Sequence, residues 1–215
     1  MLNSKRTLVP LAILGVSYFG LTILLLSLLD PDYNPISQAA SDYGVGRFAI
    51  EVNLGFLVGG LGLIAFAWAV GRKGTPRSSK AGSMLFFIAG LVLIMDSYFT
   101  TNIEGGPATM HGTIHGFGGL IFFVSAPIGV LLVSRKFGRE RLLMAAAGLI
   151  IGFALLAVNA GLSGLAERVI LLVIFTSIIV TASGLAGFPR SRFCESAAQH
   201  DTPPCPLPEK HTFRV

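Results

Sequence analysis

The chain has 215 residues, of which 53% are hydrophobic and 13% are charged. Soluble domains carry about 25% charged residues, so the composition excludes an ordinary soluble globular protein. The formal net charge of +5 would suit a nucleic-acid-binding protein, but the lysines and arginines lie in short clusters beside apolar blocks. Such clusters are typical of membrane topology signals and of contact with anionic lipids. We therefore expect membrane lipids as partners and no nucleic acid.

Apolar blocks follow one another along the chain, and a helix of about 20 residues crosses a hydrocarbon core of about 30 Å. The short alternating segments of a membrane β-barrel are absent. We therefore expect an all-α integral membrane protein that forms a six-transmembrane-helix bundle over residues 1–188. The predicted spans are residues 8–29, 52–70, 81–99, 111–133, 142–162 and 169–188. Residues 189–215 are polar and contain several prolines, which predicts a disordered cytoplasmic tail.

Basic residues are concentrated on one predicted side of the membrane. Two lie at the N-terminus, four in the loop after the second span, four in the loop after the fourth span and four in the tail, which accounts for 14 of the 16. The opposite side has only Arg47 and Arg168. Because basic loops stay in the cytoplasm, we expect both termini to be cytoplasmic.

Polar residues in the predicted spans gather near the outer ends, opposite the basic loops, and the cytoplasmic halves are expected to be nearly bare of them. They are Asn53, Asp96, His111, His115 and Asn159. An ionisable side chain within a span costs about 2.5–3.5 kcal/mol on insertion scales and usually faces the bundle interior or water. These residues therefore predict a polar pocket in the outer leaflet.

His111 and His115 are four residues apart, about 6 Å along one helix face. This spacing lets two imidazoles bind one metal ion, as in zinc hydrolases. Asp96 is a candidate third ligand, which would leave the fourth position of a divalent metal such as zinc to water, and Glu104 or Asp42 is a candidate general base. Haem is not expected, because neighbours on one helix face cannot bind both sides of a macrocycle. Asp96, His111 and His115 are thus the candidate catalytic and metal-binding residues.

Two other interpretations of these residues stay open. Asp96 can form a hydrogen-bonded pair with one of the histidines and carry a proton. Alternatively, the polar residues form a purely structural cluster at the membrane interface, since His111 lies at the water boundary and no glutamate separates the two histidines as in the zinc-hydrolase motif.

The segment between the first and second predicted spans, residues 30–51, supplies further candidates. Two of its serines are four residues apart and would share one face of a short helix. Arg47 carries the planar guanidinium group that binds phosphate and carboxylate, although it can equally pair with Asp42 or Glu51. The candidate substrate-binding residues are Ser37, Ser41, Asp42, Arg47 and Asn53.

Glycines are spaced four apart in three of the spans. The pairs are Gly55/Gly59, Gly112/Gly116 and Gly148/Gly152. Small residues at this spacing let helix backbones approach closely in lipid. They predict tight packing of the bundle and allow a helix-mediated homo-oligomer.

Three sequence elements carry a family resemblance: NPISQAASDYG after the first span, VNLGFLVGGLG in the second and HGTIHGFGGLIFF at the start of the fourth. They resemble the membrane family catalogued as domain of unknown function 998, whose members are six-span bacterial and archaeal proteins. Many members have a proline–aspartate pair near the end of the third helix, where this chain has Met95-Asp96. The resemblance covers about Leu8 to Gly187 and implies no particular activity. It implies one shared outer-face site formed by Ser41, Asp42, Gly44, Asn53, His111 and His115.

Three functions are compatible with this sequence. The first is a small membrane enzyme that acts on a lipid or another amphiphile, in which His111 and His115 bind a metal or transfer protons. The second is a proton-coupled transporter of small solutes that uses Asp96 as its protonatable group. The third is a non-catalytic membrane partner or assembly factor.

Overall fold

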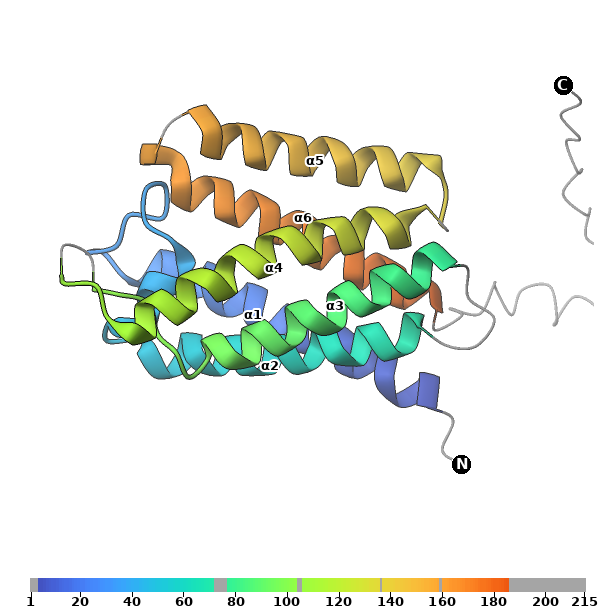
Figure 1. The fold of residues 1–215 in the computed structure, drawn as a ribbon, viewed down its shortest axis with the longest axis horizontal. Coiled ribbons are helices and arrows are strands. Elements are labelled where there is room, and N and C mark those ends of the chain that lie inside the picture. Colours follow the sequence, from blue (N-terminus) through green and yellow to red (C-terminus); the bar gives the residue numbers. More distant parts are fainter. Residues whose placement is uncertain (1–3, 72–76, 104–105, 136, 159, 186–215) are drawn as a thin grey trace, which may run out of the picture.

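The structure, a computed structural model, describes residues 4–71, 77–103, 106–135, 137–158 and 160–185. Its long helices lie side by side in one bundle (Figure 1). The helices are α1 (Ser4–Leu29), η1 (Ala40–Val45), α2 (Ala49–Val70), α3 (Arg77–Asp96), α4 (Met110–Ser134), α5 (Arg139–Val158), η2 (Ala160–Leu162) and α6 (Ser163–Leu185), with η1 and η2 being short 3-10 helices. The predicted tail at residues 189–215 and the candidates Glu104 and Asn159 lie outside the described residues.

Within the described residues, six helices, α1 to α6, are long and apolar enough to cross a membrane. This confirms the predicted all-α, six-helix architecture. α3 ends at Asp96, and the chain turns over residues 97–99. α6 begins at Ser163, six residues before the predicted sixth span, so Glu167 and Arg168 lie on the helix rather than in a loop.

Glycines set the closest helix crossings of the bundle. Each helix from α1 to α4 packs against the next, α6 closes the bundle against α1, and α5 packs mainly against α6. A Cβ atom on Gly15 of α1 would lie 2.6 Å from the Cα atom of Gly62 in α2. Similarly, a Cβ atom on Gly60 of α2 would lie 2.6 Å from the carbonyl oxygen of Gly90 in α3. Any larger residue would push these backbones apart.

Two of the three predicted small-residue pairs, Gly55/Gly59 and Gly148/Gly152, pack against a neighbouring helix. Gly55 and Gly59 of α2 lie against the ring of Phe19 in α1, and Gly152 of α5 lies against α6. Gly116 of α4 faces open space, since a Cβ atom there would have no heavy atom within 4 Å. The helix-mediated homo-oligomer stays a prediction.

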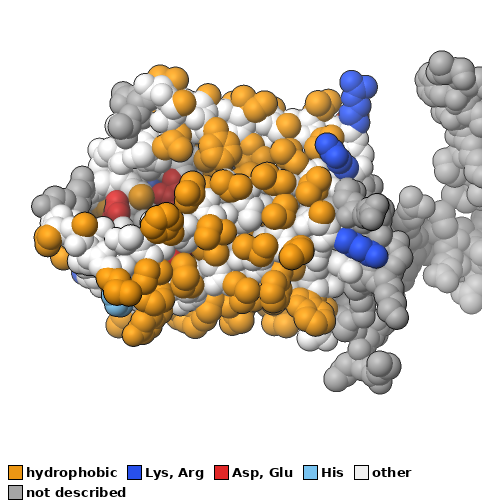
Figure 2. Space-filling model, viewed as in Figure 1, with side chains coloured by type: hydrophobic (Ala, Val, Ile, Leu, Met, Phe, Trp, Pro, Cys, Tyr) orange, Lys and Arg blue, Asp and Glu red, His pale blue; other side chains and the backbone are white. Residues whose placement is uncertain are grey.

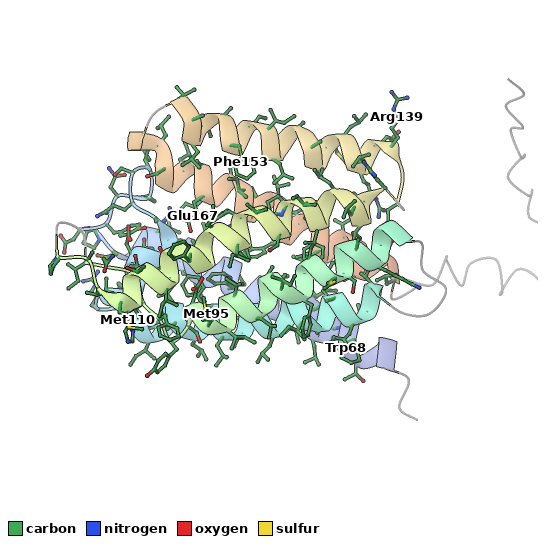
Figure 3. The ribbon with its side chains drawn as sticks, viewed as in Figure 1. Trp68, Met95, Met110, Arg139, Phe153 and Glu167 are labelled. Atoms are coloured by element: carbon green, nitrogen blue, oxygen red, sulfur yellow. The ribbon has the colours of Figure 1, made fainter. Side chains whose placement is uncertain are left out.

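The two ends of the bundle differ in charge (Figure 2). The basic end is defined by Lys80, Arg135, Arg139 and Arg141. The opposite end, here called the site end, contains the α1–α2 connection (residues 30–48), the end of α3 and the starts of α4 and α6. Figure 2 shows acidic side chains there, among neutral atoms. Trp68 marks the basic end in Figure 3, and Met110 and Glu167 mark the site end.

Hydroxyl groups are also buried away from the site end. They belong to Ser79, Ser125, Ser134 and Thr181. The halves of the spans nearer the basic end were expected to be nearly bare of polar groups, and they hold these few buried hydroxyl groups. These residues are small, and serine or threonine adds little polarity to a mean hydropathy profile, so the pattern of the sequence did not reveal them.

Candidate functional site

Asp96 and His115 form a buried pair at the site end. Asp96 is the last residue of α3 and is 2% exposed, while His115 lies in the second turn of α4 and is 9% exposed. The Nδ1 atom of His115 lies 2.8 Å from the carbonyl oxygen of Phe99 and 3.6 Å from Oδ1 of Asp96. Among the described residues, that Oδ1 atom has no hydrogen-bond partner. The structure thus brings together the predicted acid and one of the two predicted histidines.

The contact with Phe99 determines where His115 carries its proton. A carbonyl oxygen only accepts, so Nδ1 carries a hydrogen and Nε2 holds the lone pair of the neutral ring. A buried carboxylate without a partner is costly, so the pair of Asp96 and His115 is expected to be neutral as a whole. The pair is then either a carboxylic acid beside a neutral imidazole or a carboxylate beside an imidazolium. Both forms have zero net charge, which suits a group that exchanges protons with a ligand.

The surroundings of the pair leave it little room to move. A Cβ atom on Gly118, one turn after His115, would overlap Oδ1 of Asp96, so the glycine provides the space that the carboxyl group occupies. Phe56 of α2 places its ring edge-on to the imidazole, with 5.9 Å between the ring centroids. Helices α2, α3 and α4 therefore each contribute to holding the pair.

His111 lies apart from this pair. It is exposed in the first turn of α4, and its ring centroid is 5.8 Å from that of Tyr98 and 5.1 Å from that of Phe99. Among the described residues, no group of three or more His, Cys, Asp or Glu side chains is placed to hold a metal ion. The predicted three-ligand centre of Asp96, His111 and His115 is therefore not assembled. Helical spacing places the two histidines on one side of α4, but only the deeper one, His115, pairs with Asp96.

A second cluster forms where α6 meets the α1–α2 connection. The Oγ atom of Ser163 donates a hydrogen bond to the carbonyl oxygen of Ser37 at 2.7 Å. Oε2 of Glu167 accepts a hydrogen bond from the amide of Ala40 at 2.9 Å. A Cβ atom on Gly164 would overlap a backbone oxygen of the connection, so this close approach requires glycine. The connection is thus fixed to the first turns of α6, where Figure 3 labels Glu167.

Arg168 lies at the centre of this second cluster. Its Nη1 atom donates to the carbonyl oxygens of Gln38 at 3.0 Å and Gly164 at 2.9 Å. Its Nε and Nη2 atoms each lie 3.3 Å from Oγ of Ser27, and Nη2 also lies 3.3 Å from the hydroxyl oxygen of Tyr33. All of these acceptors are neutral. Among the described residues, no ion pair joins Arg168 to a carboxylate.

Two stacked tyrosines lie beside Arg168. The ring centroids of Tyr33 and Tyr43 are 3.8 Å apart, and the guanidinium carbon is 5.5 Å from the centroid of Tyr33. Burial raises the pKa of Tyr33, and a hydrogen bond from Arg168 opposes this change. Burial also raises the pKa of Tyr43, while the nearby Ser27 hydroxyl and the Arg168 guanidinium act in the opposite direction. The Tyr43 hydroxyl is buried and has no hydrogen-bond partner among the described residues.

The predicted substrate-binding residues of the connection make contacts within the protein. The Oδ2 atom of Asp42 accepts a hydrogen bond from the amide of Ala39 at 2.9 Å, which caps η1. The Nδ2 atom of Asn53 donates to the carbonyl oxygen of Gly44 at 3.3 Å and so joins η1 to α2. Ser41 is half-buried within η1. Substrate binding by these residues stays a prediction.

Arg47 points to the surface of the site end. It pairs with Asp30 at 3.1 Å, whereas the sequence suggested Asp42 or Glu51, because the connection folds back over the end of α1. It also donates to the carbonyl oxygen of Leu29 at 3.1 Å. Asp30, Asp42 and Arg47 all line a cavity of about 160 Å³.

Sequence reasoning missed the cluster around Glu167 and Arg168, because both residues were assigned to a loop. One signal was available: Arg168 is one of only two basic residues away from the basic clusters. A cation kept on the poorly basic side of a membrane protein needs specific partners. The roles of Tyr33 and Tyr43 depend on contacts between distant segments and have no local signature.

The fold and these two clusters define a multi-pass helical membrane protein with a buried carboxyl–imidazole pair and a half-buried arginine at one end. The chain belongs to the family described as protein of unknown function (DUF998), whose model matches residues 13–184. The matched range includes Asp96, His115, Glu167 and Arg168, and this confirms the resemblance noted from the sequence. No curated protein and no solved structure matches the chain.

Proposed function

We propose that this protein is a membrane enzyme that acts on a lipid or another amphiphile at its site end, with Asp96 and His115 exchanging protons with the ligand. The observation that supports this most is the Asp96 Oδ1 atom, which is buried, has no hydrogen-bond partner in the part of the chain that the structure describes and lies 3.6 Å from Nδ1 of His115. Ionisable side chains are costly within membrane spans and usually serve function there. A carboxyl–imidazole pair supplies both an acid and a base for general catalysis.

We also propose that the site end faces away from the cytoplasm, in a prokaryotic plasma membrane, and that both termini are cytoplasmic. The concentration of basic residues at the other end supports this orientation. The amphiphile would then be an outer-leaflet lipid or a molecule that reaches that leaflet from outside. Accessibility of single cysteines at the two ends to a membrane-impermeant thiol reagent in intact cells tests the orientation.

Proton transfer fits the described side chains better than metal catalysis. A zinc centre built on His115 would need two further protein ligands, and His111 packs against aromatic rings instead. Metal analysis of the purified protein separates the two mechanisms. About one zinc per chain that is lost in both His111→Ala and His115→Ala would overturn the proton-transfer mechanism.

The enzymatic proposal is tested with the full chain in liposomes made from a total bacterial polar lipid extract. Lipids are compared before and after incubation by liquid chromatography and mass spectrometry. The wild-type chain should convert one lipid class, and Asp96→Asn and His115→Gln should each abolish this conversion. His111→Gln, a change at the exposed histidine, is the matched control and should retain conversion. An unchanged lipid pool with the wild-type chain, or full activity of Asp96→Asn, would refute the proposal.

A proton-coupled transporter is the second candidate, and the buried hydroxyls of Ser125, Ser134 and Thr181 favour it. They extend polar groups from the pair toward the basic end. However, His115 and Ser125 are ten residues apart along α4, which is about 15 Å of helix. The buried residues between them include Phe122. Acidification of the liposome lumen that depends on Asp96 would support transport. If the variants change only protein abundance, the non-catalytic role as a membrane partner is the better description.

A further inference from the structure

A long groove runs between α1 and α6 and ends at Arg168. Its volume is about 490 Å³, within the range of about 300–1,000 Å³ found for ligand pockets. Mostly apolar side chains line it, and its polar end is formed by Ser27 and Arg168. The groove is therefore amphipathic along its length.

The dimensions of the groove match one leaflet of a bilayer. Along α1 its lining extends from Val16 to Ser27, which is about 16 Å of helix. Half of a hydrocarbon core of about 30 Å is about 15 Å. Gly20 lines the groove without a side chain that would narrow it, since a Cβ atom there would lie 3.3 Å from the ring of Phe175. An extended acyl chain can therefore lie along α1 from the membrane centre to the level of Arg168.

The polar end of the groove suits a negatively charged group. Arg168 is half-buried, and all of its hydrogen-bond acceptors are neutral. Two of these acceptors, the hydroxyls of Ser27 and Tyr33, are at 3.3 Å, and a phosphate oxygen can replace them with shorter, charge-assisted bonds. The Tyr43 hydroxyl lies near Ser27 and Arg168, but Tyr43 lines the cavity of the α1–α2 connection and does not line this groove.

We propose that this groove binds an anionic phospholipid, with one acyl chain between α1 and α6 and the headgroup phosphate held by Arg168. The inference deepens the proposed function, because it identifies the amphiphile as a phospholipid with net negative charge. The groove is also in contact with the Asp96–His115 pair through a row of aromatic rings. Ring centroids are 5.7 Å apart for Phe175 and Phe19, 4.8 Å for Phe19 and Phe56, and 5.9 Å for Phe56 and His115.

Photo-crosslinking of the full chain in nanodiscs tests this proposal without depending on turnover. The probes are phosphatidylglycerol and phosphatidylcholine, each with a photoreactive group in one acyl chain. Phosphatidylglycerol should label peptides of α1 and α6 several-fold more strongly than phosphatidylcholine. Equal labelling by the two probes, or labelling spread evenly over all helices, would show that no anionic lipid site exists in the groove.

Two variants keep the test independent of folding defects. Leu24→Trp fills the groove from a side chain that is 55% exposed, and Leu25→Trp is its control, because Leu25 is 53% exposed but does not line the groove. Leu24→Trp should lose the specific labelling and Leu25→Trp should retain it. Equal labelling of the two tryptophan variants would overturn the proposal.

These results are separable from those of the enzymatic proposal. Specific phosphatidylglycerol labelling with no lipid conversion would leave the binding site standing and remove the catalytic role. Lipid conversion that survives Leu24→Trp would leave the catalytic role standing and remove this groove as the route of the substrate.

Discussion

Gly118→Ala tests whether the Asp96 carboxyl group is held where the structure places it. The added Cβ atom would overlap Oδ1 of Asp96 and lie 2.8 Å from the terminal methyl carbon of Met95. The Asp96 side chain is short and 2% exposed. It can therefore avoid the added Cβ atom of Gly118→Ala only by turning its carboxyl group away from His115. Overpacking of this kind costs about 1–3 kcal/mol.

Gly119→Ala is the matched control, because a Cβ atom at Gly119 has no heavy atom within 4 Å. Both substitutions gain about 1 kcal/mol of helix propensity, and this term cancels when the two variants are compared. The remaining difference of about 1–3 kcal/mol corresponds to unfolding temperatures about 5 °C apart for a chain of this size. Gly118→Ala should be the less stable variant.

The assay is thermal unfolding of both variants in one detergent, followed by intrinsic fluorescence, together with lipid conversion in liposomes. Gly118→Ala should unfold earlier and lose conversion, while Gly119→Ala should retain conversion and be at least as stable as the wild-type chain. Identical unfolding temperatures for the two variants would refute the close contact between α3 and α4 on which the site depends.

Three further substitutions test the second cluster and the surface of the site end. Glu167→Ala leaves the Ala40 amide without its acceptor and should cost about 1–3 kcal/mol, visible as faster hydrogen exchange in the η1 segment. Arg47→Ala breaks an exposed ion pair with Asp30 and should change stability by less than about 1 kcal/mol in a denaturant titration. Tyr33 has a raised pKa, so its contribution to stability is complete below about pH 10 and is lost as pH rises through the pKa of the folded state. Tyr33→Phe should therefore flatten the alkaline loss of thermal stability, and an unchanged pH profile would contradict the assigned burial.

The six helices could be predicted because each apolar block is long enough to cross a bilayer. The start of α6 could not, because Glu167 and Arg168 read as loop residues in a hydropathy pattern. Their partners are backbone and hydroxyl groups of the α1–α2 connection, more than a hundred residues earlier in the chain. Contacts between segments so far apart cannot be predicted from the local sequence.

The candidate site was predicted in part. Asp96 and His115 do meet, since a carboxyl group and an imidazole at similar depth in neighbouring helices face the same interior. Helical spacing could not decide which histidine reaches Asp96, because this depends on where α3 ends and on the Phe99 carbonyl group. Asp42 and Asn53 were predicted to bind a ligand because they are polar and lie near the outer ends of the spans. Their side chains instead form hydrogen bonds with backbone atoms of Ala39 and Gly44, at and within η1.

The attachment of α6 to the α1–α2 connection has a consequence for biogenesis. Besides the bonds of Ser163 and Glu167, the amide of Leu165 donates to the carbonyl oxygen of Ile36 at 2.9 Å. A ribosome releases the first hairpin long before it synthesises these partners, and domains form as their segments emerge. The hairpin of α1 and α2 is therefore in the bilayer before α6 is inserted, and until then these backbone groups of the connection lack their α6 partners. Arg168 is inserted with α6, after its hydrogen-bond acceptors in α1 and in the α1–α2 connection have been synthesised.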